Sequence, residues 1–464
     1  MSVFDGILIV VSMGLIGLLF IKKQPSLFFL SIVGSVVALL IVLQGFIESV
    51  KWQVYPFYGG VLLVGFILYI QTRYGLKRWV RGTLLTLSVV LFLLSSVALY
   101  VFPVYDLPEP TGIYDIGTTS YTVNDHSREE LYNGDVDTRT IKIQLWYPAE
   151  TTDGYEQVPW LEDGRVVARA LAVDTGLPAF VLDHTTSILS HSYKDAAINT
   201  SETSYPVIII SHGWRGFRNL HNDFAEELAS HGYIVVSIDH TYGTVATVFD
   251  GTVAPLNLEA LPLRNTTPDF LEYANTLVNT YGDDVITTLN YLEDLQDGTI
   301  DSMFTGVLDV DSIGVVGHST GGGGDVAAAL KDDRIDAVFG LDAWVESIDE
   351  TLLEQGLDIP SVFVRSGAWE ESYNNEQLYT LIDNSPSSIL YQVDGTTHYD
   401  FSMVYMYSPL TGVIGFTGDV DGRYLNTILE TMMVDFFDET LQNDTMNPLD
   451  ISPWDEVREI LIPE

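Results

Sequence analysis

The strongest structural signal in the chain is the segment Ile313-Gly314-Val315-Val316-Gly317-His318-Ser319-Thr320-Gly321, an apolar run that ends in the pattern G-x-S-x-G. A stretch with helical composition, residues 324–330, follows it directly. A serine in a tight turn between a buried strand and a helix has its hydroxyl lifted above the edge of a sheet. The segment therefore predicts a strand, a sharp turn and a helix, with Ser319 as the candidate nucleophile.

Apolar runs on both sides of this segment indicate the other strands of one sheet. They are continuous and rich in valine and isoleucine, which is typical of strands buried on both faces of a parallel sheet. Helical stretches alternate with them, and this alternation predicts an α/β fold. The expected strands cover residues 141–147, 207–211, 233–239, 313–317, 337–341, 361–365 and 389–393, and the expected helices cover 222–230, 324–331 and 423–441. Residues 241–300 show no strand signal and are interpreted as an insertion or a lid-like segment with a helix over 268–295.

A serine hydroxyl at neutral pH needs an adjacent base to become a nucleophile. In enzymes with this strand–turn–helix arrangement the base follows the serine and the acid along the chain. His398 is the only one of the nine histidines that comes after Ser319. It follows the expected strand 389–393, so it should lie at the carboxyl edge of the sheet, where such folds bind their ligands. His398 is therefore the predicted base.

The acid that orients this histidine has two candidate positions. Asp342 ends the expected strand 337–341, and Glu370 and Glu371 follow the next strand. An acid at either strand end can reach the same histidine. An aspartate that ends an apolar strand is costly unless it is paired, which favours Asp342.

A developing oxyanion needs backbone N–H groups that are already in place around it. One should come from Thr320, which follows the nucleophile, and the other from the loop after an earlier strand. Residues 211–216 form such a loop, with Trp214 as the predicted donor. His212 in the same loop is an alternative base, although a bracing role for the loop is favoured.

The first 105 residues differ in composition from the rest. They carry two acidic and seven basic side chains, whereas the remainder carries 61 and 14. The apolar runs 6–21, 26–47, 54–70 and 82–104 predict about four transmembrane helices over residues 1–105. Lys22 and Lys23 in the first loop, and the four basic residues at 73–81 in the third, place these loops in the cytoplasm. A proline-marked, open linker at 107–112 then leads to an extracytoplasmic domain, residues 106–464.

Composition also excludes several classes of function. The chain has no cysteine, which rules out disulfides, a cysteine nucleophile and Cys-ligated metal sites. A formal net charge of −42 argues against a nucleic-acid partner, because phosphate binding needs clustered lysine and arginine. Residues 419–422 faintly resemble a calcium loop but lack the remaining ligands, so no metal is predicted.

Several segments, in their order along the chain, resemble the plasma-type platelet-activating-factor acetylhydrolase family, the lipoprotein-associated phospholipases of the α/β-hydrolase superfamily. The resemblance covers about residues 108–441 and implies the triad Ser319, Asp342 and His398, with Trp214 and Thr320 as oxyanion donors. The glycine run 321–324 departs from that pattern and resembles bacterial cutinase and polyester-hydrolase relatives. The apolar residues 1–105 are not part of the family pattern. The segments are 211–218, His231-Gly232-Tyr233, Gly317-His318-Ser319, Leu341-Asp342-Ala343-Trp344 and His398-Tyr399-Asp400-Phe401.

These observations predict a membrane-anchored serine ester hydrolase with an α/β-hydrolase fold that needs no cofactor. The resemblance implies phospholipids with short or oxidised acyl chains as substrates, while small esters and polyesters stay open. The alternative from another class is a catalytically silent binding or scaffold domain on a membrane anchor.

Overall fold

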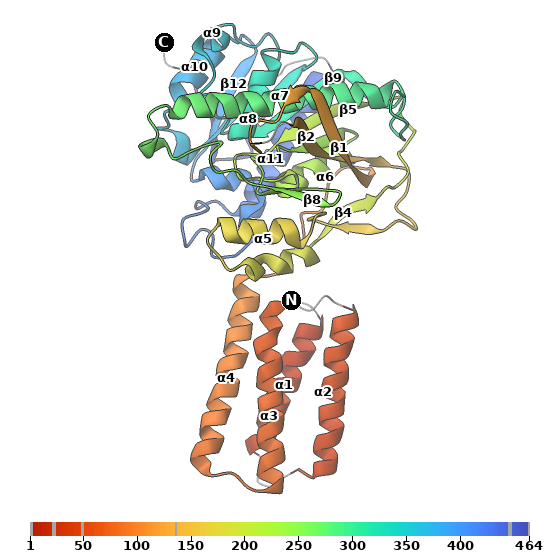
Figure 1. The fold of residues 1–464 in the computed structure, drawn as a ribbon, viewed down its shortest axis with the longest axis vertical. Helices are drawn as coiled ribbons and strands as arrows, with labels where there is room; N and C mark the ends of the chain where they lie inside the picture. Colours follow the sequence, from red (N-terminus) through yellow and green to blue (C-terminus); the bar gives the residue numbers. More distant parts are fainter. Residues whose placement is uncertain (1–2, 21–24, 48–50, 135–136, 444–447, 463–464) are drawn as a thin grey trace.

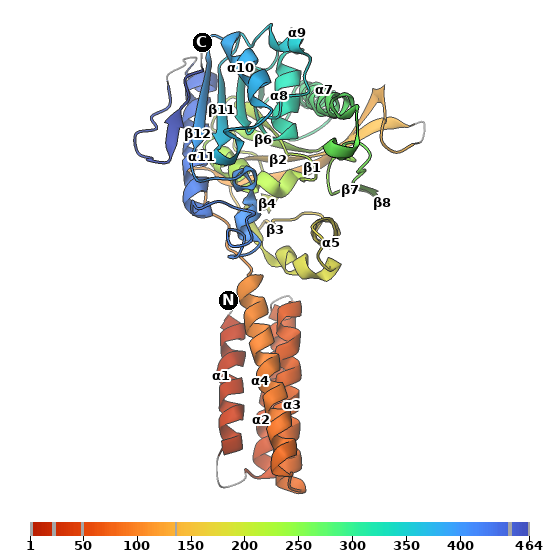
Figure 2. The same cartoon turned by 90° about the vertical axis from the view of Figure 1, so that its left-hand side faces the viewer.

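The chain folds into a bundle of apolar helices and an α/β domain above it (Figure 1). This computed structural model describes residues 3–20, 25–47, 51–134, 137–443 and 448–462. The last helix of the bundle leads into the domain, as two views at right angles show (Figures 1 and 2). Lys22 and Lys23, which enter the topology prediction, lie outside the described residues.

Four helices form the bundle at the positions of the four predicted apolar runs. Three regions, Leu27–Phe46, Trp52–Arg73 and Arg78–Val101, are long and apolar enough to cross a membrane. Large apolar side chains point outward from the bundle, including Phe28 and Phe46, which are 76% and 86% exposed. A helix that is apolar all round is typical of a membrane span. The helices are α1 Val3–Phe20, α2 Leu27–Ile47, α3 Tyr55–Arg73 and α4 Arg78–Val101.

The top of the bundle contacts the domain through a tryptophan. Trp52 belongs to the short helix η1, Trp52–Val54, and its indole N–H donates to the carbonyl oxygen of Val181 at 2.9 Å. Its ring also packs edge-on against Phe180, with ring centroids 5.4 Å apart. Phe180 and Val181 lie in η2, Ala179–Ser187, which follows α5, Arg165–Asp174. The bundle is therefore joined to the domain by more than the chain itself.

The domain is built on an 11-stranded sheet with the order β13-β12-β11-β10-β9-β5-β6-β2-β1-β4-β3. The six strands from β12 to β6 are parallel, and all seven predicted strands are confirmed. The strands are β1 Asp115–Glu129, β2 Thr138–Ala149, β3 Gln157–Pro159, β4 Leu189–Lys194, β5 Tyr205–Ser211, β6 Ile234–Asp239, β9 Leu308–His318, β10 Ala337–Leu341, β11 Ser361–Ser366, β12 Ser388–Val393 and β13 Val457–Glu459.

The expectation that residues 141–147 form a parallel strand is wrong. They belong to β2, which runs antiparallel to both of its neighbours, β1 and β6. A short connection joins β1 to β2, and such a connection allows only antiparallel pairing. β2 is nonetheless almost fully buried, so its composition matches that of a buried parallel strand.

Helices cover both faces of the sheet. Phe224 and Leu228 of α6 pack with Leu429 and Met432 of α11 on one face. Val285 of α7 packs with residues of α8, α9 and α10 on the other. Their bounds are α6 Asn222–Ser230, α7 Phe270–Gln296, α8 Thr320–Ala329, α9 Glu350–Leu353, α10 Asn375–Asp383 and α11 Gly422–Phe437.

The interpretation of residues 241–300 needs a correction. The segment contains a hairpin of β7, Ala246–Phe249, and β8, Thr252–Pro255, although no strand was expected there. The hairpin turns at Asp250-Gly251, with Gly251 at a φ of +82°, and Asp-Gly is a strong hairpin signal. The predicted helix over 268–295 is confirmed as α7, and its buried apolar face makes it a layer of the domain.

Candidate active site

Ser319 lies in a strained turn at the end of the central strand β9. Its φ of 56° and ψ of −121° are unusual for a residue with a side chain, and α8 begins at the next residue. Packing requires glycine beside it, because a Cβ on Gly321 would lie 2.2 Å from the carbonyl oxygen of Ser211. Backbone strain of this kind persists where the surroundings enforce it, and it clusters at functional sites. The predicted strand–turn–helix setting of Ser319 is therefore present.

The structure joins Ser319, His398 and Asp342 in one hydrogen-bonded chain. His398 Nε2 lies 3.0 Å from Ser319 Oγ, and His398 Nδ1 lies 2.9 Å from Asp342 Oδ2. An ionised carboxylate only accepts, so Nδ1–H donates to Asp342 and Nε2 is left to accept from the serine hydroxyl. The three residues follow β9, β10 and β12, whose carboxyl ends meet at one edge of the sheet.

Asp342 has the surroundings of an orienting acid. Its side chain is fully buried, and it accepts from the backbone N–H of Ser366 at 2.8 Å and from the Ser366 hydroxyl at 2.6 Å. Its own φ of 42° is also positive. The competing candidates lie elsewhere: Glu370 is exposed and pairs with Arg458 at 3.0 Å, and Glu371 is exposed. The geometry thus connects only Asp342 to the imidazole.

The predicted oxyanion loop passes directly against Ser319. A Cβ on Gly213 would lie 3.0 Å from Ser319 Cβ, which brings the loop that carries Trp214 beside the serine. Arg215 holds this loop with a φ of 67° and an ion pair to Asp174 of α5. Thr320 opens α8, where the first N–H groups have no acceptor within the helix and the helix end is positive.

His212 has the contacts of a bracing residue. Its Nδ1 lies 2.7 Å from the Gly213 carbonyl oxygen and its Nε2 lies 2.9 Å from Thr244 Oγ1. Burial lowers the pKa of His212 well below its ordinary value, and the nearby His240 lowers it further. With both ring nitrogens engaged, His212 ties the loop to the segment after β6.

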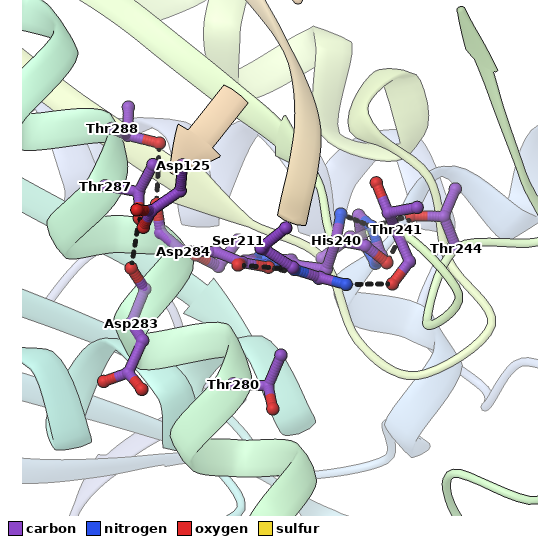
Figure 3. A network of polar contacts seen from close by, with 12 residues as sticks. Asp125, Ser211, His240, Thr241, Thr244, Thr280, Asp283, Asp284, Thr287 and Thr288 are labelled. Atoms are coloured by element: carbon purple, nitrogen blue, oxygen red, sulfur yellow. Dashed lines mark hydrogen bonds and ion pairs between the residues drawn. The ribbon is translucent and has the colours of Figure 1, made fainter. Parts of the chain in front are cut away.

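A buried ion-pair network lies near this loop, and Figure 3 shows Asp284 and His240 within it. Asp284 of α7 bonds Arg139 of β2 at 2.6 Å and His240 Nδ1 at 3.0 Å. Burial alone would raise the pKa of Asp284, but Arg139 outweighs it and holds that pKa well below its usual range. The His240 ring stacks on Tyr281 and lies edge-on to His212, so the network reaches the loop.

A second buried acid lies under the nucleophile turn. Asp325 of α8 accepts from the Ser211 hydroxyl at 2.6 Å, which links the helix after Ser319 to the end of β5. Burial raises the pKa of Asp325 to about 8. Burial therefore disfavours the charged form of Asp325.

Sequence reasoning missed Ser366 and Trp369. Ser366 follows the expected strand 361–365 directly, and its hydroxyl donates to the buried Asp342. A hydroxyl at the end of a strand was the one available sign that Asp342 would have a hydrogen-bond donor there. Trp369 precedes Glu370, and its indole stacks on the imidazole of His398. No spacing rule connects these two residues to the triad candidates, because the connection arises from neighbouring strands.

The region that resembled a calcium loop has a structural role. Asp421 caps α11 by accepting from the backbone N–H groups of Arg423 and Tyr424, each at 3.1 Å. Within the described ranges, no three histidine or carboxylate side chains converge in a way that would hold a metal ion.

Fold and site together define a class of enzyme. A mostly parallel sheet with flanking helices presents a strained serine, a histidine and a buried carboxylate at its carboxyl edge. The protein is a carboxylic ester hydrolase. It belongs to the family described as platelet-activating factor acetylhydrolase, isoform II, whose family model matches residues 100–459.

Individual relatives agree with this assignment. The chain is 22% identical to the platelet-activating factor acetylhydrolase of Canis lupus familiaris, over 76% of this chain and 80% of that one. The enzyme of the same name from Cavia porcellus is also 22% identical, over 73% of this chain and 78% of that one. Among solved structures, a ferulic acid esterase from Streptomyces cinnamoneus has the same fold, with a TM-score of 0.62 at 20% identity, covering 77% of this chain and 100% of that one.

Proposed function

We propose that this protein is a membrane-anchored serine ester hydrolase in which Ser319 is the nucleophile, His398 the base and Asp342 the orienting acid. The observation that carries the proposal is the hydrogen-bonded chain from Ser319 Oγ through the His398 ring to Asp342, with distances of 3.0 and 2.9 Å. These distances are those of a base in direct reach of the proton it removes.

The reaction follows from this arrangement. Ser319 Oγ attacks the ester carbonyl carbon while His398 Nε2 takes its proton, and Asp342 stabilises the imidazolium that forms. The tetrahedral intermediate collapses, the alcohol leaves with the proton from His398, and an acyl group stays on Ser319. Water, deprotonated by the same imidazole, then attacks the acyl-enzyme. The second tetrahedral intermediate collapses, the imidazolium returns the proton to Ser319 Oγ, and the carboxylic acid leaves.

The oxyanion of each tetrahedral intermediate is held by the backbone N–H groups of Trp214 and Thr320. Two features support this assignment: the close approach of Gly213 to Ser319, and the position of Thr320 at the start of α8. Donors fixed in advance stabilise the developing charge without reorganising during the reaction.

The proposed substrates are esters with an apolar portion, foremost phospholipids with short or oxidised acyl chains. The family supports this class. So do two aromatic side chains near His398, Tyr399 and Phe416, which pack together and remain 49% and 41% exposed. A cutinase-like action on polyesters is the second candidate, and the glycine run 321–324 favours it. A panel of p-nitrophenyl esters, phospholipids and a soluble polyester oligomer separates these classes by kcat/KM.

We further propose that residues 1–105 form a transmembrane region of four helices and that residues 106–464 form an extracytoplasmic domain. Three helices have sufficient length and hydropathy, and α1 would be the fourth. The basic residues Arg73, Lys77, Arg78 and Arg81 at the loop between α3 and α4 support a cytoplasmic position for that loop.

Labelling with a fluorophosphonate tests the catalytic proposal. The reagent should modify the full-length protein in membranes, and peptide mapping should place the label on Ser319. Absence of labelling in a folded protein would favour the silent binding or scaffold domain instead.

A further inference from the structure

Two aromatic rings lie close to the imidazole of His398. The indole of Trp369 lies parallel to it, with ring centroids 4.5 Å apart and planes inclined by 5°. The ring of His318 also lies close to the imidazole, with ring centroids 4.5 Å apart and planes inclined by 34°. The edges of the imidazole are occupied by Ser319 and Asp342. The proposed base therefore has four defined neighbours, and its side chain stays 23% exposed.

Trp369 is held in this position by the backbone. It ends the short helix η5, Gly367–Trp369, directly after β11. Gly367 N–H donates to Thr396 Oγ1 at 3.2 Å, and Ala368 N–H donates to the Thr396 carbonyl oxygen at 3.0 Å. Thr396 lies two residues before His398, so the same turn that carries the indole is tied to the segment that carries the imidazole.

The rings of Trp369 and His318 differ in how they interact with positive charge on the His398 imidazole. Burial lowers the pKa of His318 well below its ordinary value, and the neighbouring His398 and His221 lower it further. Neutral His318 donates through Nε2–H to the carbonyl oxygen of His398 at 3.0 Å. The face of an indole is electron-rich and attracts a cation that lies over it. The indole of Trp369 therefore stabilises positive charge on the His398 ring, whereas His318 only packs against that ring.

We propose that Trp369 is a positioning residue that stabilises the imidazolium of His398 each time Ser319 transfers its proton. The inference rests on the proposed triad and adds a residue that acts through the base. The indole favours the charged ring both in the transition state and in the free enzyme. Trp369 therefore raises kcat. It also places the acid limb of the pH dependence of kcat/KM, the side on which activity falls as the pH is lowered, at a higher pH.

Other titratable groups also face the imidazole and must stay constant in any test. Asp342 and neutral His318 contact it, and Tyr399 lies edge-on to it at 5.8 Å. Asp400 bonds the N–H groups of Thr397 and Gly418. Glu370 and Glu371 follow Trp369 in sequence, and Glu370 pairs with Arg458. Replacing only the indole leaves all of these groups in the protein.

The test compares Trp369→Leu and Trp369→Phe in the full-length protein, with kcat, KM and the pH dependence of kcat/KM measured on a soluble p-nitrophenyl ester. Trp369→Leu should lower kcat roughly 3- to 30-fold and leave KM nearly unchanged. Its acid limb should move to lower pH by about 0.5 to 1.5 units, because a less stable imidazolium forms only in more acid solution. Trp369→Phe should fall between Leu and Trp, since benzene attracts a cation less strongly than indole.

Trp344→Leu is the matched control, because Trp344 follows Asp342 but its ring packs against Phe270. Its acid limb should stay where it is in the unmodified protein.

An acid limb that stays in place or moves to higher pH in both Trp369 variants would overturn the inference, and a raised KM alone would mean that Trp369 contacts substrate. If Trp369→Leu does not fold, Trp369→Phe and Trp369→Tyr decide by the same criterion. An active Ser319→Ala variant would refute the triad itself, which none of these outcomes does.

Discussion

Ser319 owes its conformation to its neighbours. A serine has no preference for a φ of 56°, and the turn exists because the backbone around Gly317 and Gly321 packs too closely for side chains. The same positive φ recurs at Asp342 and at Arg215 in the oxyanion loop. Among the described residues, three of the five that have a side chain and a positive φ thus lie at the proposed site, and the other two are Asp195 and Tyr242.

Motif and chain order allowed Ser319 and His398 to be named, whereas Asp342 was preferred over Glu370 and Glu371 because an unpaired buried carboxylate is costly and because of the family resemblance. Ser366 and Trp369 were not predicted, because their roles depend on β11 lying next to β10 and β12. Chain order carries no information about which residue of a neighbouring strand points at a given carboxylate. A residue that acts through another side chain is therefore found from the structure.

The choice of acid gives the first residue-scale prediction. Asp342→Asn should lower kcat about 10⁴-fold, because an amide neither stabilises the imidazolium nor selects the correct tautomer. Glu370→Gln should retain nearly full activity, since Glu370 contacts Arg458 on the surface. Steady-state kinetics on a p-nitrophenyl ester compares the two variants. A fully active Asp342→Asn together with an inactive Glu370→Gln would return the acid to the later strand.

Among the elements, buried strands were predicted best, whereas partly exposed strands were missed, including the 15-residue β1. The runs that became β5, β6 and β9 to β12 are buried on both faces, so their composition is unmistakable. The hairpin β7–β8 is partly exposed and has only four residues in each strand, so it left no continuous apolar run. The antiparallel direction of β2 depends on its connection to β1, which composition does not report.

The packing of α11 on α6 gives a prediction at the element scale. Glu430 of α11 is 9% exposed, and burial together with Asp223 and Glu227 of α6 raises its pKa to about 9. A raised pKa in the folded state means that stability is greatest below the ordinary value of 4.5 and falls as pH rises toward 9. Glu430→Gln removes this dependence.

Glu430→Gln should therefore change the free energy of unfolding more favourably at pH 8 than at pH 5. The difference between the two changes should be at most about 4 kcal/mol. Urea unfolding at the two pH values measures the difference. The control is Glu376→Gln on α10, where the side chain is exposed. Equal effects of Glu430→Gln at both pH values would mean that Glu430 is charged at pH 5.

At the scale of the whole molecule, charge and apolar surface are separated. Nearly all acidic side chains lie after residue 105, while the bundle exposes its apolar side chains. The linker at 107–112, predicted to be open, packs against the domain: Leu107 is buried, and Thr111 bonds Glu227 through its N–H at 2.7 Å. Arg423 also bonds the carbonyl oxygen of Asp106. Protease accessibility at this linker is therefore a poor test of topology.

The absence of cysteine offers a better test of topology. Asp153→Cys lies on the exposed surface of the domain, and Tyr74→Cys lies beside the loop between α3 and α4. A membrane-impermeant maleimide should label Asp153→Cys in intact cells and Tyr74→Cys only after the membrane is opened. The unmodified protein serves as the blank. Labelling in the reverse order would reject the extracytoplasmic placement, whether or not α1 spans.

The most direct measurement is the kcat/KM of Ser319→Ala on a p-nitrophenyl ester, beside the unmodified protein and the surface variant Ser201→Ala. The substitution removes one hydroxyl, so the circular dichroism spectrum and the melting temperature should stay close to those of the unmodified protein. Activity should fall roughly 10⁴- to 10⁶-fold, as it does when the nucleophile of a catalytic triad is lost. Ser201→Ala should keep full activity. A folded Ser319→Ala protein that retained more than about a hundredth of the activity would contradict the assignment of Ser319 as the nucleophile.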